Sequence, residues 1–386
     1  MITTVAIAGY RSLRDVLLPM APLTVITGAN GSGKSNVYRA LRLLASAATG
    51  QSAALLAREG GLPSVLWAGP ERFSKGMRSG EQPVQGGPRQ HRVSLRLGFA
   101  SDEFSYAVDY GLPEPQRTLF SHDPEIKREA VWHGPVYRPG SVLTERRGPQ
   151  VVRREGAKKV PVAGAIATFD SMLTHIADPE RCPEVLILRE QMRGWRFYDH
   201  FRTDQDAPAR QLQVGTRTPV LSHDGHDLAA ALQTINEIGD AQALATAVDD
   251  AFPGASLQIE VQDGRFGVVM HQHGLLRALT QAEFSDGTLR YLLWIAALLT
   301  PRPPALMVMN EPETSLHPDL MPALARLIDV ACEQCQVWVV THSTRLAAAL
   351  EASAACESVF LTKELGATQP AAQGLLDAPP WRWPSR

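Results

Sequence analysis

Eight residues near the start of the chain have the composition and spacing of a phosphate-binding loop. They read Gly28-Ala29-Asn30-Gly31-Ser32-Gly33-Lys34-Ser35, the pattern G-x-x-x-x-G-K-S. Glycines allow backbone N–H groups to point at phosphate oxygens, and a helix that begins at the loop adds its positive N-terminal end. The pattern predicts that Lys34 meets the β- and γ-phosphates of ATP and that Ser35 binds Mg²⁺. The predicted nucleotide-binding residues are Gly28, Asn30, Gly31, Ser32, Gly33, Lys34, Ser35 and Asn36.

Two further segments end in residues that can act on a phosphate. Leu306 to Met309 is a short apolar run typical of a central strand, and Asn310 and Glu311 follow it. A carboxylate there can deprotonate the water that attacks the γ-phosphate, so Glu311 is the predicted general base. The other interpretation is a solvated acidic strand end.

A second buried strand, Val337 to Thr341, ends in His342. An imidazole at this place can hydrogen-bond the γ-phosphate and sense its loss. Taken alone, His342 would more often be a structural residue. Together with the loop and Glu311 it becomes the predicted switch of the site.

These residues need a strand, a loop and a helix to position them. Leu23 to Thr27 is a β-branched run, and Ser35 to Ala48 carries apolar residues at the helical period. Thr3 to Ile7 predicts another strand, with the start of the chain at the edge of a sheet. Val93 to Phe99 and Phe104 to Val108 alternate like antiparallel strands.

The middle of the chain is less periodic. Residues 122–218 contain frequent Pro and Arg, with helix candidates at Ala163 to Ala177 and Glu184 to Met192, and we interpret this part as an inserted lid. We expect a solvent loop at 69–90 and an irregular tail after Thr368. The predicted domains are 1–120 with the phosphate loop and a β lobe, 121–218 as the lid, and 219–386 with the remaining motifs.

In this order the motifs resemble those of the ABC-type ATPases of the RecF and SMC kind, in particular the RecF-like bacterial ATPases of the AAA15 or AAA21 type. The resemblance covers nearly the whole chain. It rests on Gly9-Tyr10-Arg11-Ser12-Leu13, the loop ending in Lys34-Ser35, Phe284-Ser285-Asp286-Gly287-Thr288-Leu289-Arg290, Asn310-Glu311-Pro312-Glu313-Thr314-Ser315-Leu316-His317-Pro318 and Thr341-His342-Ser343.

The resemblance implies an α/β P-loop NTPase fold of the ABC-ATPase (RecF/SMC-head) type, with a mixed central sheet, an antiparallel β lobe and an inserted lid lobe. It implies that Ser285 and Gly287 contact the γ-phosphate bound to a second subunit, so the active form is a head-to-tail homodimer with two ATP sites. The stretch Ser315 to His317 corresponds to the D-loop, which lies across that interface in relatives.

The sequence departs from the family pattern in two places. The residue before the catalytic Glu is usually acidic and supports Mg²⁺, whereas Asn310 offers a neutral carbonyl oxygen. We expect Ser35 and Asn310 to be the metal-site residues. Because Asn310 is neutral, we also expect Mg²⁺ to bind more weakly, and ATP to be hydrolysed more slowly, than in relatives with an acidic residue at this position. The glutamine of the Q-loop is not placed, and Gln51, Gln82 and Gln85 all remain candidates.

Composition limits the class of protein. The 386 residues carry a formal charge of −2, with 44% hydrophobic and 20% charged residues, which is typical of a globular protein and gives no overall nucleic-acid signature. The start has no signal-peptide pattern, and no apolar run approaches the roughly 20 residues that a spanning helix needs. We expect a cytoplasmic protein without a membrane segment. Cys332 and Cys335 are expected to be reduced structural thiols.

Two other clusters admit a functional interpretation. Four arginines alternate with four aromatic residues between Arg189 and Arg202, a combination that can bind DNA phosphates and bases. The interpretation that we favour is a helix and turn with buried aromatics and solvated or paired arginines. His271 and His273, near Asp263, could hold a metal, but His-x-His on a strand more often faces solvent.

Two function hypotheses follow. The first is a DNA-associated ATPase for repair or recombination, in which ATP closes a dimer and hydrolysis opens it. The second is a regulatory ATPase that controls a separately encoded toxin or nuclease, as some relatives do in phage defence. A transporter subunit is disfavoured, because the signature around Ser285 lies too far beyond Lys34.

Overall fold

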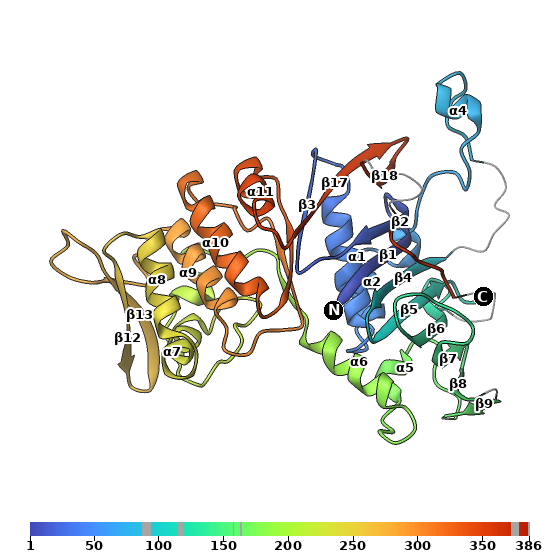
Figure 1. Ribbon diagram of the computed structural model, residues 1–386, viewed down its shortest axis with the longest axis horizontal. Coiled ribbons are helices and arrows are strands. Elements are labelled where there is room, and N and C mark those ends of the chain that lie inside the picture. Colours follow the sequence, from blue (N-terminus) through green and yellow to red (C-terminus); the bar gives the residue numbers. More distant parts are fainter. Residues whose placement is uncertain (87–93, 115–118, 157, 163, 372–377, 385–386) are drawn as a thin grey trace. The chain divides into compact units, whose positions relative to one another are not determined.

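The structure is a computed structural model that describes residues 1–86, 94–114, 119–156, 158–162, 164–371 and 378–384 (Figure 1). The chain divides into two compact units. The first contains Met1–Ala21, Thr27–Trp195 and Val359–Arg386, and the second contains Pro22–Ile26 and Arg196–Ser358. The segments 1–120, 121–218 and 219–386 do not coincide with these units, because the strand that starts at Arg196 already belongs to the second unit.

An eight-stranded antiparallel sheet forms the first unit. Its order is β2-β1-β4-β5-β6-β7-β8-β9. The bounds are β1 Ile2–Tyr10, β2 Leu13–Pro19, β4 Leu95–Ser101, β5 Phe104–Gly111, β6 Glu125–His133, β7 Val142–Arg147, β8 Gln150–Glu155 and β9 Lys158–Pro161. The strands expected at 3–7 and 104–108 are confirmed, and so is the described part of the strand expected at 93–99.

The sequence led us to expect the first strand at the edge of a sheet. The structure instead places it inside the sheet. β1 lies between β2 and β4, and Val5 pairs with Leu18 on one side and Phe99 on the other. Most of its residues, on both faces, are buried. A strand covered on both faces reads as a nearly continuous apolar run, which the sequence Val5-Ala6-Ile7-Ala8 matches.

The middle segment, which was interpreted as a lid, begins with a series of strands. Strands β6 to β9 extend the antiparallel sheet beyond β5. The helix expected at Glu184 to Met192 is confirmed as α6, Pro183–Gly194. The one expected at 163–177 is wrong for most of its described length, because only α5, Met172–His175, is helical there. Position 163 lies outside the described residues.

The rest of the first unit consists of helices and one hairpin. The helices are α1 Lys34–Ser46, α2 Ser52–Arg58, α3 Leu62–Val65 and α4 Lys75–Ser79, besides α5 and α6. The hairpin joins β17, Cys356–Glu364, to β18, Ala367–Pro370, and only Val359 onward belongs to this unit. Within the tail that was expected to be irregular, the Trp381 ring lies 5.6 Å from the Trp132 ring. Gly98 leaves the space for it, since a Cβ there would lie 2.7 Å from Trp381.

Four parallel strands carry the second set of motifs. β10 Arg196–Tyr198, β15 Leu306–Asn310, β16 Gln336–Val340 and β3 Leu23–Gly28 pair in this order, and the six-stranded sheet continues through β17 and β18. The antiparallel hairpin makes this sheet mixed, as expected. The carboxyl ends of parallel strands meet at one edge, so the residues after β10, β15 and β16 are neighbours.

Helices and a small sheet complete the second unit. They are α7 Leu228–Ile238, α8 Ala241–Ala251, α9 Asp286–Leu298, α10 Met321–Cys332, α11 Thr344–Glu351, the 3-10 turns η1 Pro208–Arg210 and η2 Pro318–Leu320, and strands β11 Gln213–Val214, β12 Ser256–Gln262, β13 Arg265–His271 and β14 Leu279–Thr280. Helix α9 is central, because every residue from Leu289 to Leu298 is buried. None of the described helices combines the length and apolar character needed to cross a membrane.

Candidate functional site

The phosphate-binding loop joins β3 directly to α1 in the first unit. The helix begins at Lys34, and its N-cap Gly33 has a φ of 109°. The Lys34 side chain is buried, and its Nζ donates hydrogen bonds to the carbonyl oxygens of Gly28 and Ala29. Ser35 is exposed in the first turn of the helix. The predicted strand, loop and helix are therefore present, with the lysine folded over the loop.

Three glycines in the loop adopt a backbone that other residues rarely take. Gly28, Gly31 and Gly33 have φ values of 147°, 78° and 109°. A Cβ on Gly28 would lie 2.4 Å from the carbonyl oxygen of Leu361, and one on Gly33 would lie 2.2 Å from Oγ1 of Thr368. At Gly31 nothing lies within 4 Å. The hairpin β17–β18 therefore packs against both ends of the loop, while its middle is open.

A hydrogen-bonded chain that the sequence did not predict supports the loop. Thr368 Oγ1 donates to the carbonyl oxygen of Ser32 at 2.7 Å and lies 2.7 Å from Ser12 Oγ. Asn36 Nδ2 in turn donates to Ser12 Oγ at 2.9 Å. Ser12 belongs to the turn between β1 and β2, so that turn and β18 hold the loop and the first turn of α1. No local pattern connects Thr368 with a loop more than 300 residues earlier.

Glu311 and His342 are close together in the second unit. Oε1 of Glu311 lies 3.0 Å from Nε2 of His342. Glu311 has a φ of 50°, a strained conformation typical of functional sites. Glu313 fixes the switch segment, because its Oε1 accepts the backbone N–H groups of His342, at 2.7 Å, and Ser343, at 3.0 Å. The predicted base and the predicted switch therefore form one hydrogen-bonded group.

Asn310 has a carboxylate beside it on the next strand. Tyr198 pairs with Met309 in the parallel register, which places Asp199 next to Asn310. Nδ2 of Asn310 donates to Oδ1 of Asp199 at 2.7 Å. Among the described residues, the buried Oδ1 of Asn310 has no hydrogen-bond partner. An orphaned oxygen next to a carboxylate fits a hard cation such as Mg²⁺.

The predicted signature residues begin helix α9. Ser285 is the N-cap, and its Oγ accepts the N–H of Thr288 at 3.1 Å. Ser285 is exposed, whereas the helix behind it is buried. Gly287 faces Ser315 of the predicted D-loop, since a Cβ would lie 3.0 Å from the Ser315 carbonyl oxygen. An exposed N-terminus on a rigid helix is a ready site for an anion.

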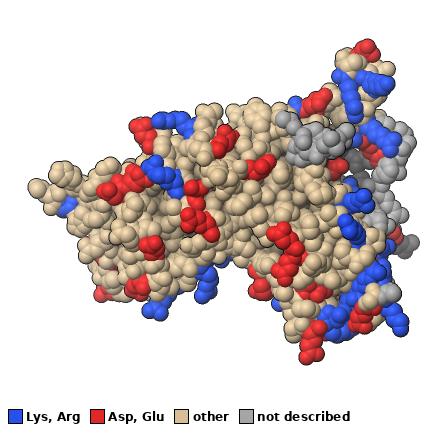
Figure 2. Space-filling model, viewed as in Figure 1, with Lys and Arg blue, Asp and Glu red and all other residues tan. Residues whose placement is uncertain are grey.

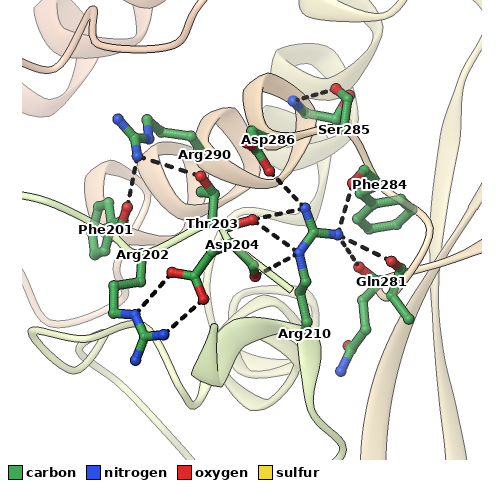
Figure 3. Close-up of polar contacts among 12 residues, drawn as sticks. Phe201, Arg202, Thr203, Asp204, Arg210, Gln281, Phe284, Ser285, Asp286 and Arg290 are labelled. Atoms are coloured by element: carbon green, nitrogen blue, oxygen red, sulfur yellow. Dashed lines mark hydrogen bonds and ion pairs between the residues drawn. The ribbon is translucent and has the colours of Figure 1, made fainter. Parts of the chain in front are cut away.

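Arg210 holds the segment before that helix, as Figure 3 shows. Its guanidinium donates to the backbone carbonyl oxygens of Thr203, Asp204, Gln281, Ala282 and Phe284, and to Oδ1 of Asp286 at 2.9 Å. The Arg210 side chain is only 8% exposed. One cation therefore ties the turn after β10 to residues 281–286.

A second buried arginine connects the signature helix to the D-loop. Arg290 donates to the carbonyl oxygen of Thr314 at 2.9 Å. It also donates to the carbonyl oxygen of Phe201 at 2.7 Å (Figure 3). Burial lowers the Arg290 pKa, and the Asp286 charge opposes that shift. Trp294 Nε1 donates to the carbonyl oxygen of Pro312 at 3.0 Å. The signature helix and the residues after Glu311 are thus one hydrogen-bonded assembly.

The cluster of arginines and aromatic residues between Arg189 and Arg202 has a structural role. Trp195, Phe197, Tyr198 and Phe201 are buried, while Arg202 pairs with Asp204 and Arg193 with Glu190. This arrangement agrees with the interpretation that we favoured. No group of three or more His, Cys, Asp or Glu within the described part of the chain is placed to hold a metal. Burial raises the pKa of the free thiols of Cys332 to about 12 and Cys335 to about 11.

Comparison with known families identifies the chain. A family model described as "AAA domain, putative AbiEii toxin, Type IV TA system" matches residues 23–348, which include all the motifs from Lys34 to His342. The chain belongs to this AAA-domain family. A search of curated proteins found no match.

The fold of this AAA-domain protein is that of an SMC head. A solved SMC head bound to the C-terminal winged-helix domain of ScpA is 14% identical, with a TM-score of 0.51, 98% of this chain covered and 99% of that chain. The SMC head domain from Thermotoga maritima is 13% identical, with a TM-score of 0.49, 97% of this chain covered and 99% of that chain. The first likeness and the family match confirm the P-loop fold of the RecF and SMC type inferred from the motifs.

Proposed function

We propose that this AAA-domain protein is an ATPase that forms an ATP-bound homodimer and acts on DNA. Lys34 and the backbone of residues 28–35 hold the phosphates, and Glu311 deprotonates the attacking water while His342 senses the γ-phosphate. Mg²⁺, when bound, neutralises charge on the phosphates. The observation that carries the proposal is the exposed Ser285 at the N-terminus of a buried helix, with Arg210 and Arg290 behind it.

That arrangement fits a partner's phosphate better than an internal role. Ser285 is exposed at the start of a helix whose residues from Leu289 to Leu298 are buried, and its Oγ caps the N–H of Thr288. Anions are stabilised at such a terminus by the helix dipole and by the free N–H groups. A second copy of the chain, carrying ATP on its own Lys34 loop, is the partner that the family resemblance implies.

Light scattering after size exclusion tests the dimer. We expect wild type to be monomeric with Mg²⁺ and ADP, and Glu311→Gln to form a dimer with Mg²⁺ and ATP, because the amide cannot deprotonate water and ATP stays bound. Glu311→Gln with Lys34→Ala is the matched control and should remain a monomer. A monomer of Glu311→Gln that has bound ATP would contradict the dimer, and failure of wild type to bind ATP would contradict the nucleotide site.

A basic surface on the first unit supports DNA as the substrate of the switch. Figure 2 shows Lys and Arg side chains gathered over β7 to β9. They include Arg138, Arg147, Arg153, Arg154, Lys158 and Lys159. The Arg147 and Lys159 side chains are 55% and 58% exposed. Glu145 pairs with Arg128, Arg147 and Lys159, and Glu155 pairs with Arg153, but the cations outnumber these two carboxylates, so the surface keeps a positive excess that suits phosphates.

Binding of duplex DNA at several salt concentrations tests this surface. Changing Arg147, Arg154 and Lys158 together to Gln should weaken binding about tenfold or more at low salt and lower the slope of log affinity against log salt. Arg189, Arg193 and Arg202 changed to Gln is the control, because it removes the same number of positive charges from outside the surface over β7 to β9. If the first variant and wild type bind duplex DNA with equal affinity, the surface over β7 to β9 is not the DNA-binding site.

The family description supports the alternative, a regulatory ATPase in a toxin or phage-defence system. In that case the ATP-driven dimer would control a separately encoded effector protein instead of DNA. Copurification of a defined neighbouring gene product with Glu311→Gln in ATP, together with no DNA binding by wild type at low salt, would favour the alternative.

A further inference from the structure

The position before Glu311 lacks the acid that supports Mg²⁺ in relatives, and the structure has a carboxylate one strand away. β10 and β15 are parallel, and Arg196, Phe197 and Tyr198 pair with Met307, Val308 and Met309. The next residues in that register are Asp199 and Asn310. Asn310 is the last residue of β15 and Asp199 directly follows β10, so both lie at the carboxyl end of their strand, where ligands of parallel sheets bind. A negative charge is therefore present at the same sheet edge, although on another strand.

The hydrogen bond between the two side chains orients both of them. Nδ2 of Asn310 donates to Oδ1 of Asp199 at 2.7 Å, so the carbonyl end of the amide is directed away from Asp199. That oxygen, Oδ1 of Asn310, is buried and has no partner among the described residues. Asp199 itself is exposed, and one of its oxygens is used in the bond. The pair thus presents oxygen donors that a cation can use.

Among the carboxylates of this group, Glu313 also has a buried oxygen without a partner among the described residues, Oε2, but the carboxylate that is hydrogen-bonded to Asn310 is that of Asp199. Glu311 faces His342 at 3.0 Å, and Oε1 of Glu313 accepts two backbone N–H groups. Mg²⁺ in nucleotide sites is held by one or two carboxylates together with phosphate and water oxygens. A site with only the neutral Asn310 would lack that charge.

We propose that Asp199 supplies, from the neighbouring strand, the carboxylate for the Mg²⁺ of bound ATP, and that Asn310 positions it through the amide hydrogen bond. This inference rests on the proposed nucleotide binding.

The test measures metal-dependent binding, not hydrolysis. A fluorescent non-hydrolysable ATP analogue is titrated into wild type, Asp199→Asn and the control Asp206→Asn, each with Mg²⁺ and with EDTA. Asp206 is exposed, and its change removes the same charge. We expect Asp199→Asn to lose about tenfold or more of the affinity gained from Mg²⁺, with the affinity in EDTA unchanged. Asp206→Asn should match wild type.

The double variant Asp199→Asn with Asn310→Asp makes the test specific. It exchanges the two groups and preserves an amide-to-carboxylate hydrogen bond, so it should recover most of the Mg²⁺ effect. Electron paramagnetic resonance of Mn²⁺ with the analogue gives a direct readout, with more free Mn²⁺ expected for Asp199→Asn than for wild type. Full Mg²⁺ dependence of Asp199→Asn would overturn the inference. Absence of analogue binding by wild type would instead overturn the proposed function.

Discussion

Single residues of the phosphate loop are constrained to different extents. Gly33 has both a positive φ and a neighbour, Thr368, that a side chain would meet. Gly31 has a positive φ but open space around it. Both the positive φ and the nearby Thr368 therefore require glycine at Gly33, whereas only the positive φ requires it at Gly31. Close backbone approach to phosphates adds a requirement at both positions once a nucleotide binds.

Replacing each of these glycines by alanine should distinguish the cost of the positive φ from the cost of the contact with Thr368. Without nucleotide, Gly33→Ala should destabilise the first unit by backbone strain of about 1–3 kcal/mol, and the contact with Thr368 adds to that cost. Gly31→Ala should cost only about 1 kcal/mol. Thermal unfolding without nucleotide measures both variants. Equal melting temperatures for the two would show that Thr368 does not pack against the loop.

At the scale of elements, the signature segment depends on one buried cation. Residues 281–285 connect β14 to α9, and the backbone carbonyl oxygens of Gln281, Ala282 and Phe284 accept hydrogen bonds from Arg210. The same guanidinium binds Thr203 and Asp204, which follow β10. The segment after β10, which includes the proposed metal ligand, and the start of the signature helix are therefore mechanically connected.

Arg210→Met should loosen that connection. The change keeps an apolar stem of similar length but leaves several carbonyl oxygens without a donor, a cost of about 2–3 kcal/mol. Hydrogen exchange of peptides covering 279–290 should become faster, while peptides from β4 and β5 should be unaffected. Arg202→Met is the control, because Arg202 is 55% exposed and pairs with Asp204, away from residues 281–286. Unchanged exchange in Arg210→Met would contradict the role given to Arg210.

At the scale of the whole molecule, the proposed dimer would complete each ATP site with residues of a second copy. The proposed contacts of that copy, Ser285 and Gly287, lie on the second unit, and the phosphate loop lies on the first. Variants of Ser285 therefore test the proposed dimer without changing the loop.

Ser285→Asp should prevent the dimer while sparing the fold. Aspartate is as good an N-cap as serine, so helix α9 should remain intact, but its charge would repel the γ-phosphate of the partner. In the Glu311→Gln background with Mg²⁺ and ATP, light scattering should show a monomer for Ser285→Asp and a dimer for Ser285→Thr. Binding of ATP to the monomer should stay within about twofold of the parent, since each copy holds its own nucleotide. A dimer of Ser285→Asp would place the interface elsewhere.

The nucleotide motifs could be predicted from the sequence alone because each depends on interactions between residues that are close together in the chain. The glycines and Lys34 of the loop, the apolar run before Glu311 and the period of the helix after Ser35 each depend on residues close together in the chain, and the family followed from their order. The positions of the strands that lead to these motifs were predicted for the same reason. The extension of the sheet by β6 to β9 was not predicted. Apolar and polar residues alternate only weakly in these strands, and arginines are frequent in them.

Only the tertiary structure decided which distant residues meet these motifs. Asp199 reaches Asn310 through the register of two parallel strands, Thr368 reaches the loop through a hairpin near the end of the chain, and Arg210 reaches residue 286 across the second unit. Strand register and side-chain pairing across the fold depend on the packing of the whole unit, so no pattern in a short window of sequence specifies them.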